Sequence, residues 1–424
     1  MTSKAREDRQ REEAENKSQT DVVKDKKVLR NNFVSRIYSH KGLAYIAAGN
    51  LLGSALTGIF WLLLASIQSA REYGSTNYDI SLASLLSSAA LLGLNTTVAT
   101  YLAKGTGKIN VQANQVILIS GGLAAIVISF HNWILAPFVI AMTFWMMSAY
   151  ELLGLKSYKR YAITVVGARA LQMAISIALF YYIGVNGIII GFTISFFLLS
   201  YQYYVSSKKF SLDFKLIKNK LRFSLGVYSY NVSNALFLYF DKLILAPLFG
   251  YSTLGYYQLG FQFLIFFSMV PISFYQYLIP ERCSGLGKKT SLPISGIFLS
   301  LILTVLMFIS TPWIIETFFP SFTESLSAVK ILSLGILPMM IISIINSDLL
   351  VNGKTRFIII GAVIYEALQI SLFVCLGSLF GIPGLAFAVV FALWAEAAFL
   401  VVSTNYPFIK VLEKRINGLL GHTK

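Results

Sequence analysis

The sequence predicts an all-α protein that crosses a membrane about twelve times, and two observations support this. Of the 424 residues, 56% are hydrophobic and only 13% are charged. A soluble globular protein of this length carries a larger share of charged residues. Apolar stretches of about 20 residues, each long enough to span about 30 Å of hydrocarbon as a helix, recur through most of the chain.

The connections between the predicted spans alternate in charge. Those after even-numbered spans carry several lysines and arginines, whereas those after odd-numbered spans carry almost only Arg71. Because basic loops remain on the cytoplasmic side, both termini are predicted to face the cytoplasm. The predicted spans are 43–65, 79–102, 113–130, 132–152, 162–183, 184–204, 223–248, 254–279, 292–310, 326–350, 357–380 and 382–405.

The formal net charge of +16 comes largely from these basic loops. They would lie at the level of lipid headgroups, so we expect anionic membrane lipids as partners and no nucleic acid. Residues 1–37 mix charges of both signs without apolar periodicity, which predicts a disordered tail. Cys283 and Cys375 fall in different regions, so we expect no disulfide framework, no metal site and no bound cofactor.

The second half of the chain repeats the first. Several matches share one offset of about 197 residues, and a weaker one, "YG" at 73–74 on "LG" at 254–255, has an offset of about 181. Six helices in each half would cross the membrane in the same sense, as a parallel repeat around an axis along the membrane normal. The matches at the first offset are "YELLGLKSYKR" from Tyr150 with "SDLLVNGKTR" from Ser347, "RALQ" from Arg169 with "EALQ" from Glu366, and "GVNG" from Gly184 with "GIPG" from Gly381.

The repeat predicts two six-helix lobes around a central cavity. The N-lobe would comprise residues 38–205 with helices 1 to 6, and the C-lobe residues 223–405 with helices 7 to 12. A basic cytoplasmic linker, 206–222, would join them, and residues 406–424 would form a cytoplasmic tail.

Three sequence segments carry a resemblance to a known family. They are "HKGLAYIAAGNLLGSALTGIFWLLLAS" with the following "REYG", "LLGLNTTVATYLAKG", and "YFDKLILAPLFGYSTLGYYQLGF" with the later "LIPE". Over residues 38 to 405 the chain resembles the multidrug/oligosaccharidyl-lipid/polysaccharide (MOP) exporter superfamily, and within it the polysaccharide-transporter branch of O-antigen-type flippases. The resemblance implies two lobes arranged as a V around a cavity.

The resemblance also implies a function, which is to move a lipid-linked oligosaccharide from the inner to the outer leaflet of the cell membrane by alternating access. Its partners would be the lipid-linked glycan and glycan-assembly proteins, and no covalent chemistry would occur. One alternative is a small-molecule or drug exporter of the same fold. A membrane glycan polymerase or glycosyltransferase is disfavoured, because the longest outer loop, 316–325, is short and poor in carboxylates.

Predicted helix 7 contains the first group of candidate site residues. Asn231, Asn234, Asp241 and Lys242 project within an arc of about 100° on one helix face. We expect this polar stripe to line the cavity, with Lys242 binding an anionic headgroup and Asp241 a coupling cation. The alternative is that Lys242 extends to the membrane interface while Asp241 belongs to a structural hydrogen-bond network. An ion pair between these neighbours is the least favoured account, because adjacent residues diverge on a helix.

Arg169 and Glu366 form a second group, because they are repeat equivalents of opposite charge. They could meet across the lobes as a gate, or Arg169 could recognise the diphosphate of the lipid carrier. Alternatively, each charge pairs within its own lobe. Gln172 and Gln369, three residues further on, could hydrogen-bond to sugars.

Three more carboxylates complete the candidates. Glu396, deep in helix 12, joins Asp241 and Glu366 as a candidate for Na⁺ or H⁺ coupling, because an ionisable side chain inside a membrane is costly and is usually functional. Glu151 and Asp348 stand beside basic loops at the inner ends of helices 4 and 10. We expect both to form salt bridges there.

Overall fold

The computed structural model describes residue 42 and residues 44–208, 214–283 and 291–404, and these residues form helices without any β-strand. The predicted tails 1–37 and 406–424, and part of the linker 206–222, lie outside the described residues. The helices are the first helix Ala44–Ile67, α2 Ala70–Ala90, α3 Leu94–Ala103, α4 Ile109–Ser129, α5 Leu135–Gly154, α6 Tyr158–Ile183, α7 Val185–Leu198, α8 Tyr201–Ser207, α9 Lys215–Lys218, α10 Leu221–Phe249, α11 Tyr251–Cys283, α12 Ser291–Phe318, α13 Ser325–Ser333, α14 Ile336–Val351 and α15 Thr355–Thr404.

These helices account for the twelve predicted spans. Among the described residues, eight helical segments are long and apolar enough to cross a membrane, and two bent pairs, α2 with α3 and α7 with α8, each pass as one more. The 50-residue α15 is two spans, because its backbone is non-helical at Gly381. The 29-residue α10 is not among the segments counted above, but it is long enough to cross a membrane and corresponds to the remaining predicted span, 223–248. The protein is therefore a multi-pass membrane protein of the predicted fold class.

The second span begins earlier than predicted. We expected a helix from about residue 79, but α2 starts at Ala70. Ser69 caps this helix: its side chain accepts a hydrogen bond from the backbone N–H of Glu72, and the Glu72 carboxylate accepts one from the backbone N–H of Ser69. This reciprocal capping box satisfies amides that a helix terminus otherwise leaves unpaired. The polar segment after the first helix is thus a helix start and not a long loop.

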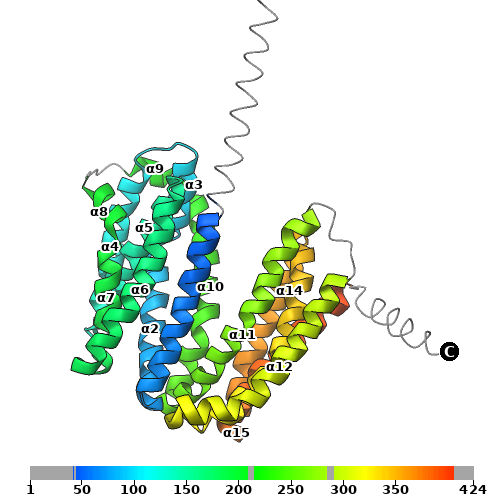
Figure 1. Cartoon of the computed structure of the whole chain (residues 1–424). Coiled ribbons are helices and arrows are strands. Elements are labelled where there is room, and N and C mark those ends of the chain that lie inside the picture. Colours follow the sequence, from blue (N-terminus) through cyan, green and yellow to red (C-terminus); the bar gives the residue numbers. More distant parts are fainter. Residues whose placement is uncertain (1–41, 43, 209–213, 284–290, 405–424) are drawn as a thin grey trace, which may run out of the picture.

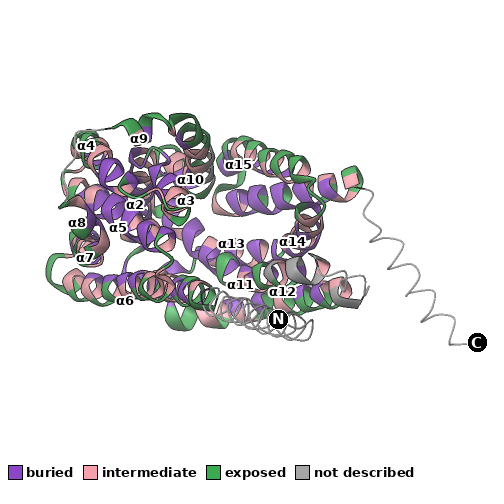
Figure 2. Cartoon of the chain, turned by 90° about the horizontal axis from the view of Figure 1, so that it is seen from above, coloured by how far each residue is buried: buried purple, intermediate pink, exposed green. Residues whose placement is uncertain are grey.

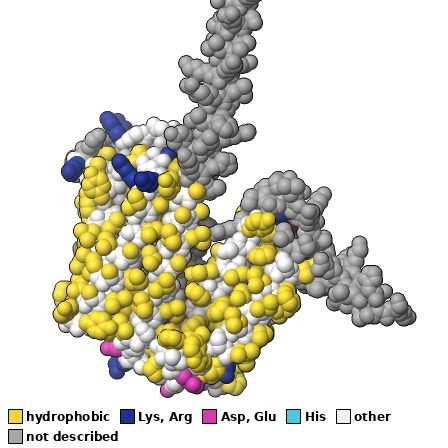
Figure 3. Space-filling model, in the orientation of Figure 1, with side chains coloured by type: hydrophobic (Ala, Val, Ile, Leu, Met, Phe, Trp, Pro, Cys, Tyr) yellow, Lys and Arg dark blue, Asp and Glu magenta, His cyan; other side chains and the backbone are white. Residues whose placement is uncertain are grey.

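The two lobes lie apart at one end of the molecule and meet at the other (Figure 1). The lobes diverge toward the end that carries the loops with Lys104, Lys156 and Lys354, which we call the basic end. The space-filling view shows lysine and arginine side chains gathered there on the N-lobe, and a band of hydrophobic side chains below them (Figure 3). The V shape predicted from the sequence resemblance is therefore present, and it opens toward the basic end.

Helix α10 contacts both lobes. It packs against α2 and α3 of the N-lobe and against α11 and α15 of the C-lobe, and the view from above shows it between the two groups (Figure 2). The half of α10 nearer the basic end is held on the N-lobe, because the Ser224 hydroxyl donates to the Leu92 carbonyl oxygen (2.9 Å). Leu92 lies at the break between α2 and α3, where the positive φ of Leu92 and Gly93 ends the helix.

The backbone confirms the internal repeat. Gly184, between α6 and α7, has φ 63° and ψ −146°, and Gly381, 197 residues later within α15, has φ 61° and ψ −136°. Just after each turn a glycine packs against the preceding helix: a β-carbon on Gly187 would collide with the Leu179 carbonyl, and one on Gly384 with the Leu376 carbonyl. The same backbone turn thus occurs at corresponding positions of both halves.

The weaker match at the other offset is also seen, as a contact between the lobes. A β-carbon at Gly74 in α2 would collide with the carbonyl oxygen of Tyr251 in α11, and one at Gly255 in α11 would collide with that of Ala70 in α2. Ala70 and Gly74 stand 181 residues before Tyr251 and Gly255. The two repeat-equivalent segments therefore pack on each other reciprocally, at the end opposite the basic end.

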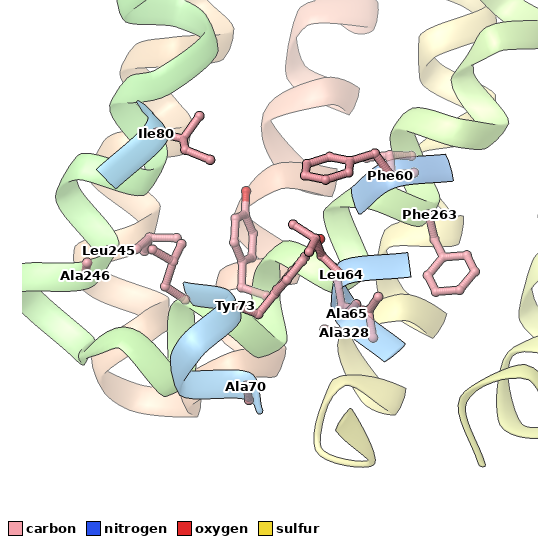
Figure 4. Close-up of a cluster of buried hydrophobic side chains, with 14 of the residues drawn as sticks. Phe60, Leu64, Ala65, Ala70, Tyr73, Ile80, Leu245, Ala246, Phe263 and Ala328 are labelled. Atoms are coloured by element: carbon pink, nitrogen blue, oxygen red, sulfur yellow. The ribbon is translucent and has the colours of Figure 1, made fainter. Parts of the chain in front are cut away.

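One hydrophobic core extends across this contact. It contains buried side chains of both halves, among them Phe60 and Tyr73 of the N-lobe and Leu245 and Phe263 of the C-lobe. Figure 4 shows Tyr73 between side chains of the first helix and Leu245 of α10. Close backbone packing through glycine and a shared apolar core join the lobes at this end.

Candidate functional site

A polar pocket lies between the N-lobe and α10. Its volume is about 150 Å³. Among the described residues, its polar lining side chains are hydroxyls and amides, and none of them is charged. The lining residues are Ser84, Ser88, Asn95, Met142, Met146, Tyr150, Asn231, Ala235, Leu238 and Tyr239.

A hydrogen bond between the lobes crosses this pocket. The Asn231 amide of α10 donates to the Asn95 side-chain oxygen of α3 at 3.2 Å. The predicted polar stripe of helix 7 is therefore divided: Asn231 faces the N-lobe, while Asp241 and Lys242, nearly three turns away, are buried on the C-lobe side. The side chain of Asn234 lies outside the described residues.

Arg169 lies in the N-lobe beside this pocket. Its guanidinium is 5.2 Å from the centre of the Trp145 ring and 5.6 Å from that of Phe196, two rings that stack on each other. One of its N–H groups donates to the side-chain oxygen of Gln172 at 2.9 Å, so these two predicted residues do meet. Tyr239, which lines the pocket, is within electrostatic range of Arg169. Among the described residues no carboxylate forms an ion pair with this guanidinium.

Asp241 and Lys242 form the ion pair that we considered least favoured, so that expectation is wrong. The Lys242 ammonium lies 2.9 Å and 3.2 Å from the two Asp241 carboxylate oxygens and donates a further hydrogen bond to the Leu238 carbonyl (3.1 Å). It also lies over the Phe261 ring. Both side chains are more than nine-tenths buried. The long lysine chain can turn back to its neighbour, and an unpaired buried ammonium would be far more costly than this bend.

The other predicted coupling residues lie near this pair. Glu366 is half-buried and lies within electrostatic range of Asp241, Lys242 and Glu396. Gln369 is buried beside Tyr257. The C-lobe therefore brings together three carboxylates and one ammonium on α10 and the two halves of α15.

Arg169 and Glu366 do not meet in this conformation. Arg169 contacts the aromatic rings and the glutamine of its own lobe, whereas the charged neighbours of Glu366 belong to helices of the C-lobe and α10. The repeat-equivalent positions thus have separate surroundings. Of the arrangements considered from the sequence, the structure shows each charge within its own lobe.

The prediction for Glu151 is wrong and that for Asp348 is confirmed. Glu151 is fully buried, and among the described residues no cation pairs with it. Its carboxylate instead accepts hydrogen bonds from neutral groups, which come from Asn110 and Asn114 of α4 and from Gln202 and Ser206 of α8. Asp348 pairs with Arg282 at 3.4 Å. Basic residues nearby in the sequence did not indicate what Glu151 contacts in three dimensions.

Sequence reasoning missed most of the polar pocket. Ser84, Ser88 and Asn95 line the N-lobe side of the pocket, and their spacing of four and seven residues is that of one face of a continuous helix. That periodicity was the available signal. Small hydroxyl side chains are common in membrane helices, however, so the signal gains meaning only once the facing helix is known.

No family model and no curated protein matches the sequence. Solved structures do match. The lipid II flippase MurJ, in an inward closed conformation, has a TM-score of 0.73 at 15% identity, over 88% of this chain and 90% of MurJ. The fold is that of the MOP exporters.

Two further MOP structures have the same architecture. The MATE multidrug transporter DinF-BH in complex with R6G has a TM-score of 0.56 at 15% identity, over 85% of this chain and 94% of that one. An outward-facing multidrug resistance MATE transporter of the MOP superfamily also scores 0.56, at 12% identity, over 88% and 96%. The fold implied by the sequence resemblance is thus confirmed.

Proposed function

We propose that this MOP-type transporter moves a lipid-linked oligosaccharide from the inner to the outer leaflet of the cell membrane. The two lobes would alternate around the polar pocket, with both termini in the cytoplasm. The observation that carries the proposal is the placement of Arg169, a guanidinium without a carboxylate partner among the described residues, beside a pocket of hydroxyl and amide groups.

The chemistry of these groups suits the two parts of such a substrate. Hydroxyls and amides such as those of Ser88, Asn95 and Asn231 both donate to and accept from sugar hydroxyls. A planar guanidinium binds a phosphate through two parallel hydrogen bonds. Gln172, which positions Arg169, and Gln369 in the C-lobe would add further amide contacts to the glycan. The higher TM-score to a lipid II flippase than to the MATE transporters also supports this choice.

The C-lobe carboxylates would couple transport to a cation. Lys242 satisfies Asp241, which leaves Glu366 and Glu396 to exchange H⁺ or Na⁺ when the lobes move. The basic loops would bind anionic lipids, and glycan-assembly proteins would deliver the substrate on the same side.

The leaflet distribution of lipid-linked oligosaccharide in depleted cells tests the proposal. Depletion should leave this lipid on the cytoplasmic leaflet, and wild-type protein should restore its transfer. Arg169→Ala should fail to restore transfer at normal protein levels. Arg160→Ala, on the same helix but exposed, is the matched control and should rescue fully.

The variant Arg169→Lys separates the contribution of the positive charge from that of the planar guanidinium geometry. A charge alone survives in Arg169→Lys, whereas the bidentate geometry is lost, so transfer should fall well below wild type. Full rescue by Arg169→Lys would show that the guanidinium does not recognise the phosphate. An unchanged leaflet distribution on depletion would contradict the flippase itself and favour a small-molecule exporter of the same fold.

A further inference from the structure

Two lysine side chains meet at one tyrosine ring at the basic end. The Lys104 ammonium lies 5.3 Å from the centre of the Tyr101 ring, and the Lys220 ammonium lies 4.7 Å from it. Tyr101 and Lys104 stand at the end of α3, whereas Lys220 directly precedes α10. The Phe223 ring of α10 packs edge-on against Tyr101, with the ring centres 5.5 Å apart. We call these four residues the α3–α10 lysine cluster.

The cluster carries two positive charges. Among the described residues, no carboxylate forms an ion pair with either ammonium. Lys104 and Phe223 are exposed, and Lys220 and Tyr101 are partly exposed. The aromatic ring attracts each ammonium, but two ammoniums beside the same ring also repel each other. An anion that contacts both of them would remove this repulsion.

Close packing of the two helices holds the cluster together. A β-carbon on Gly93, just before α3, would collide with the Ser224 carbonyl oxygen of α10. The Ser224 hydroxyl also donates to the Leu92 carbonyl oxygen. Helix α3 and the basic-end half of α10 therefore form one packed pair, which brings the two ammoniums to the same ring.

The cluster and the polar pocket lie on the same two helices. Asn95 of α3 and Asn231 of α10 line that pocket and hydrogen-bond to each other. Along α10, Lys220 precedes Asn231 by about three turns, or about 16 Å. Helices α3 and α10 lie next to each other on the side of the N-lobe that faces α15 (Figure 2). A group bound at the cluster would therefore stand between the basic end and the pocket.

We propose that the α3–α10 lysine cluster is an entry site, which binds the diphosphate of the lipid-linked substrate in the inner leaflet before that group reaches Arg169. The inference rests on the proposed function for the identity of the lipid. The basic end would lie at the level of the headgroups, where a lipid-bound phosphate also lies. Lysine binds phosphate as a point charge, which suits a transient contact, whereas the guanidinium of Arg169 can form two parallel hydrogen bonds.

The number of charges favours a diphosphate over an ordinary phospholipid headgroup. A diphosphate carries a negative charge on each phosphate and so matches both ammoniums of the cluster. Phosphatidylglycerol carries one negative charge and would leave one ammonium uncompensated. The rings of Tyr101 and Phe223 supply an apolar surface beside the charges, against which the first part of the lipid chain could pack.

Binding of farnesyl diphosphate to the purified full-length protein tests the proposal. This short isoprenoid carries a diphosphate, and equilibrium dialysis of the labelled compound against protein in phosphatidylcholine nanodiscs measures its affinity. The measurement is made in the Arg169→Ala protein, because the guanidinium in the pocket would bind the same group. We expect saturable binding, which Lys104→Gln combined with Lys220→Gln should weaken by about tenfold. Farnesol, which lacks the diphosphate, should not compete.

Two paired variants are the controls. Lys159→Gln with Arg160→Gln removes two exposed charges from the start of α6, at the same end of the same lobe, and should leave the affinity unchanged. Lys104→Arg with Lys220→Arg keeps both charges of the cluster and should bind nearly as well as the parent protein. This second pair separates loss of charge from a change in folding.

Four results would overturn the proposal. They are the absence of saturable binding, equal weakening by the α6 control pair, competition by phosphatidylglycerol at the affinity of farnesyl diphosphate, and equally tight binding of inorganic diphosphate. The third would indicate a general site for anionic lipids, and the fourth a site for a soluble ligand. If only the leaflet assay failed, the proposed function would fall and a site for lipid diphosphates would remain. If only this binding failed, the entry site alone would fall.

Discussion

The turn at Gly184 in the N-lobe and the turn at Gly381 in the C-lobe have nearly the same backbone, with φ of 63° and 61°. Four helical turns before each of them, Arg169 and Glu366 occupy equivalent positions with opposite charge and different surroundings. The backbone of the repeat was thus retained where only glycine fits, whereas the side chains facing the interior diverged. The lobes therefore share a backbone fold but differ in the charged side chains that they place in the interior.

Glu151 and Asp348 show the same divergence at the basic end. Glu151 is fully buried among neutral donors, whereas the Asp348 side chain is 40% exposed and pairs with Arg282. The Glu151 carboxylate ties helices α4, α5 and α8 together, whereas Asp348 is the partly exposed partner of the buried Arg282 side chain. Equivalent positions of the repeat therefore need not contribute equally to the free energy of unfolding.

The contact between the two glycine-containing segments should be the most sensitive part of the molecule. Gly255→Ala adds one methyl group that would meet the Ala70 carbonyl, so the lobes could no longer close at the end opposite the basic end. We expect transport to be lost and the lobes to separate there. Spin labels at Trp133 and Glu316, exposed positions in different lobes, should report a longer distance.

The reciprocal contact at Gly74 provides one control for this experiment, and an uncrowded glycine, Gly122, provides the other. Gly74→Ala should behave as Gly255→Ala does, because its methyl group would meet the Tyr251 carbonyl. At Gly122 a β-carbon would have no neighbour within 4 Å, so Gly122→Ala should change neither distance nor transport. If only one of the two contact variants had an effect, the contact would not be the symmetric closure described above.

Charge removal should affect the two lobes differently. Lys242→Met leaves the buried Asp241 carboxylate uncompensated, and the free energy of unfolding should fall by about 3–5 kcal/mol. Adding Asp241→Asn should recover much of that loss, because the remaining charge disappears. Denaturant titration of the protein in detergent measures both.

Arg169→Met is the comparison in the N-lobe. Because no carboxylate among the described residues pairs with Arg169, its removal leaves no charge behind. It does leave the buried Gln172 side-chain oxygen without its donor, so we expect the free energy of unfolding to fall by about 1–3 kcal/mol, less than for Lys242→Met. Transport should nevertheless be lost. A destabilisation as large as that of Lys242→Met would mean that Arg169 has a structural role.

The carboxylates at the basic end give the next effect in size. Glu151→Ala leaves several buried donors unmatched and should lower the free energy of unfolding by about 2–3 kcal/mol. Asp348→Ala removes a partly exposed ion pair and should cost less than about 1 kcal/mol. Similar losses for both would contradict the contrast drawn between them, and thermal melting followed by light scattering would rank the two variants independently.

Much of the fold could be predicted from local patterns. Apolar length, loop charge and the repeated "GVNG" and "GIPG" segments each follow from requirements that act within a few residues. Ser69 and Glu72 are the exception, because their capping box is also a local signal, yet the predicted second span begins only at residue 79.

The candidate site was harder to predict from the sequence, because it depends on which helices pack against each other. The helical projection of helix 7 gives only the direction in which each side chain leaves the backbone. It does not predict that the long Lys242 side chain bends back to Asp241. Asn95 gains its role only from Asn231 on a helix 136 residues away.

A pair of equal, moderate effects tests the repeat most directly. Gly184 and Gly381 adopt a backbone conformation that residues with a β-carbon rarely reach, and an added β-carbon would have no neighbour within 4 Å at either position. Alanine at each should therefore cost only backbone strain, about 1–3 kcal/mol of the free energy of unfolding. Because the strain arises from φ and ψ alone, the two losses should agree within the error of denaturant titration. A clear difference between Gly184→Ala and Gly381→Ala would mean that the turns share a shape but differ in what holds them.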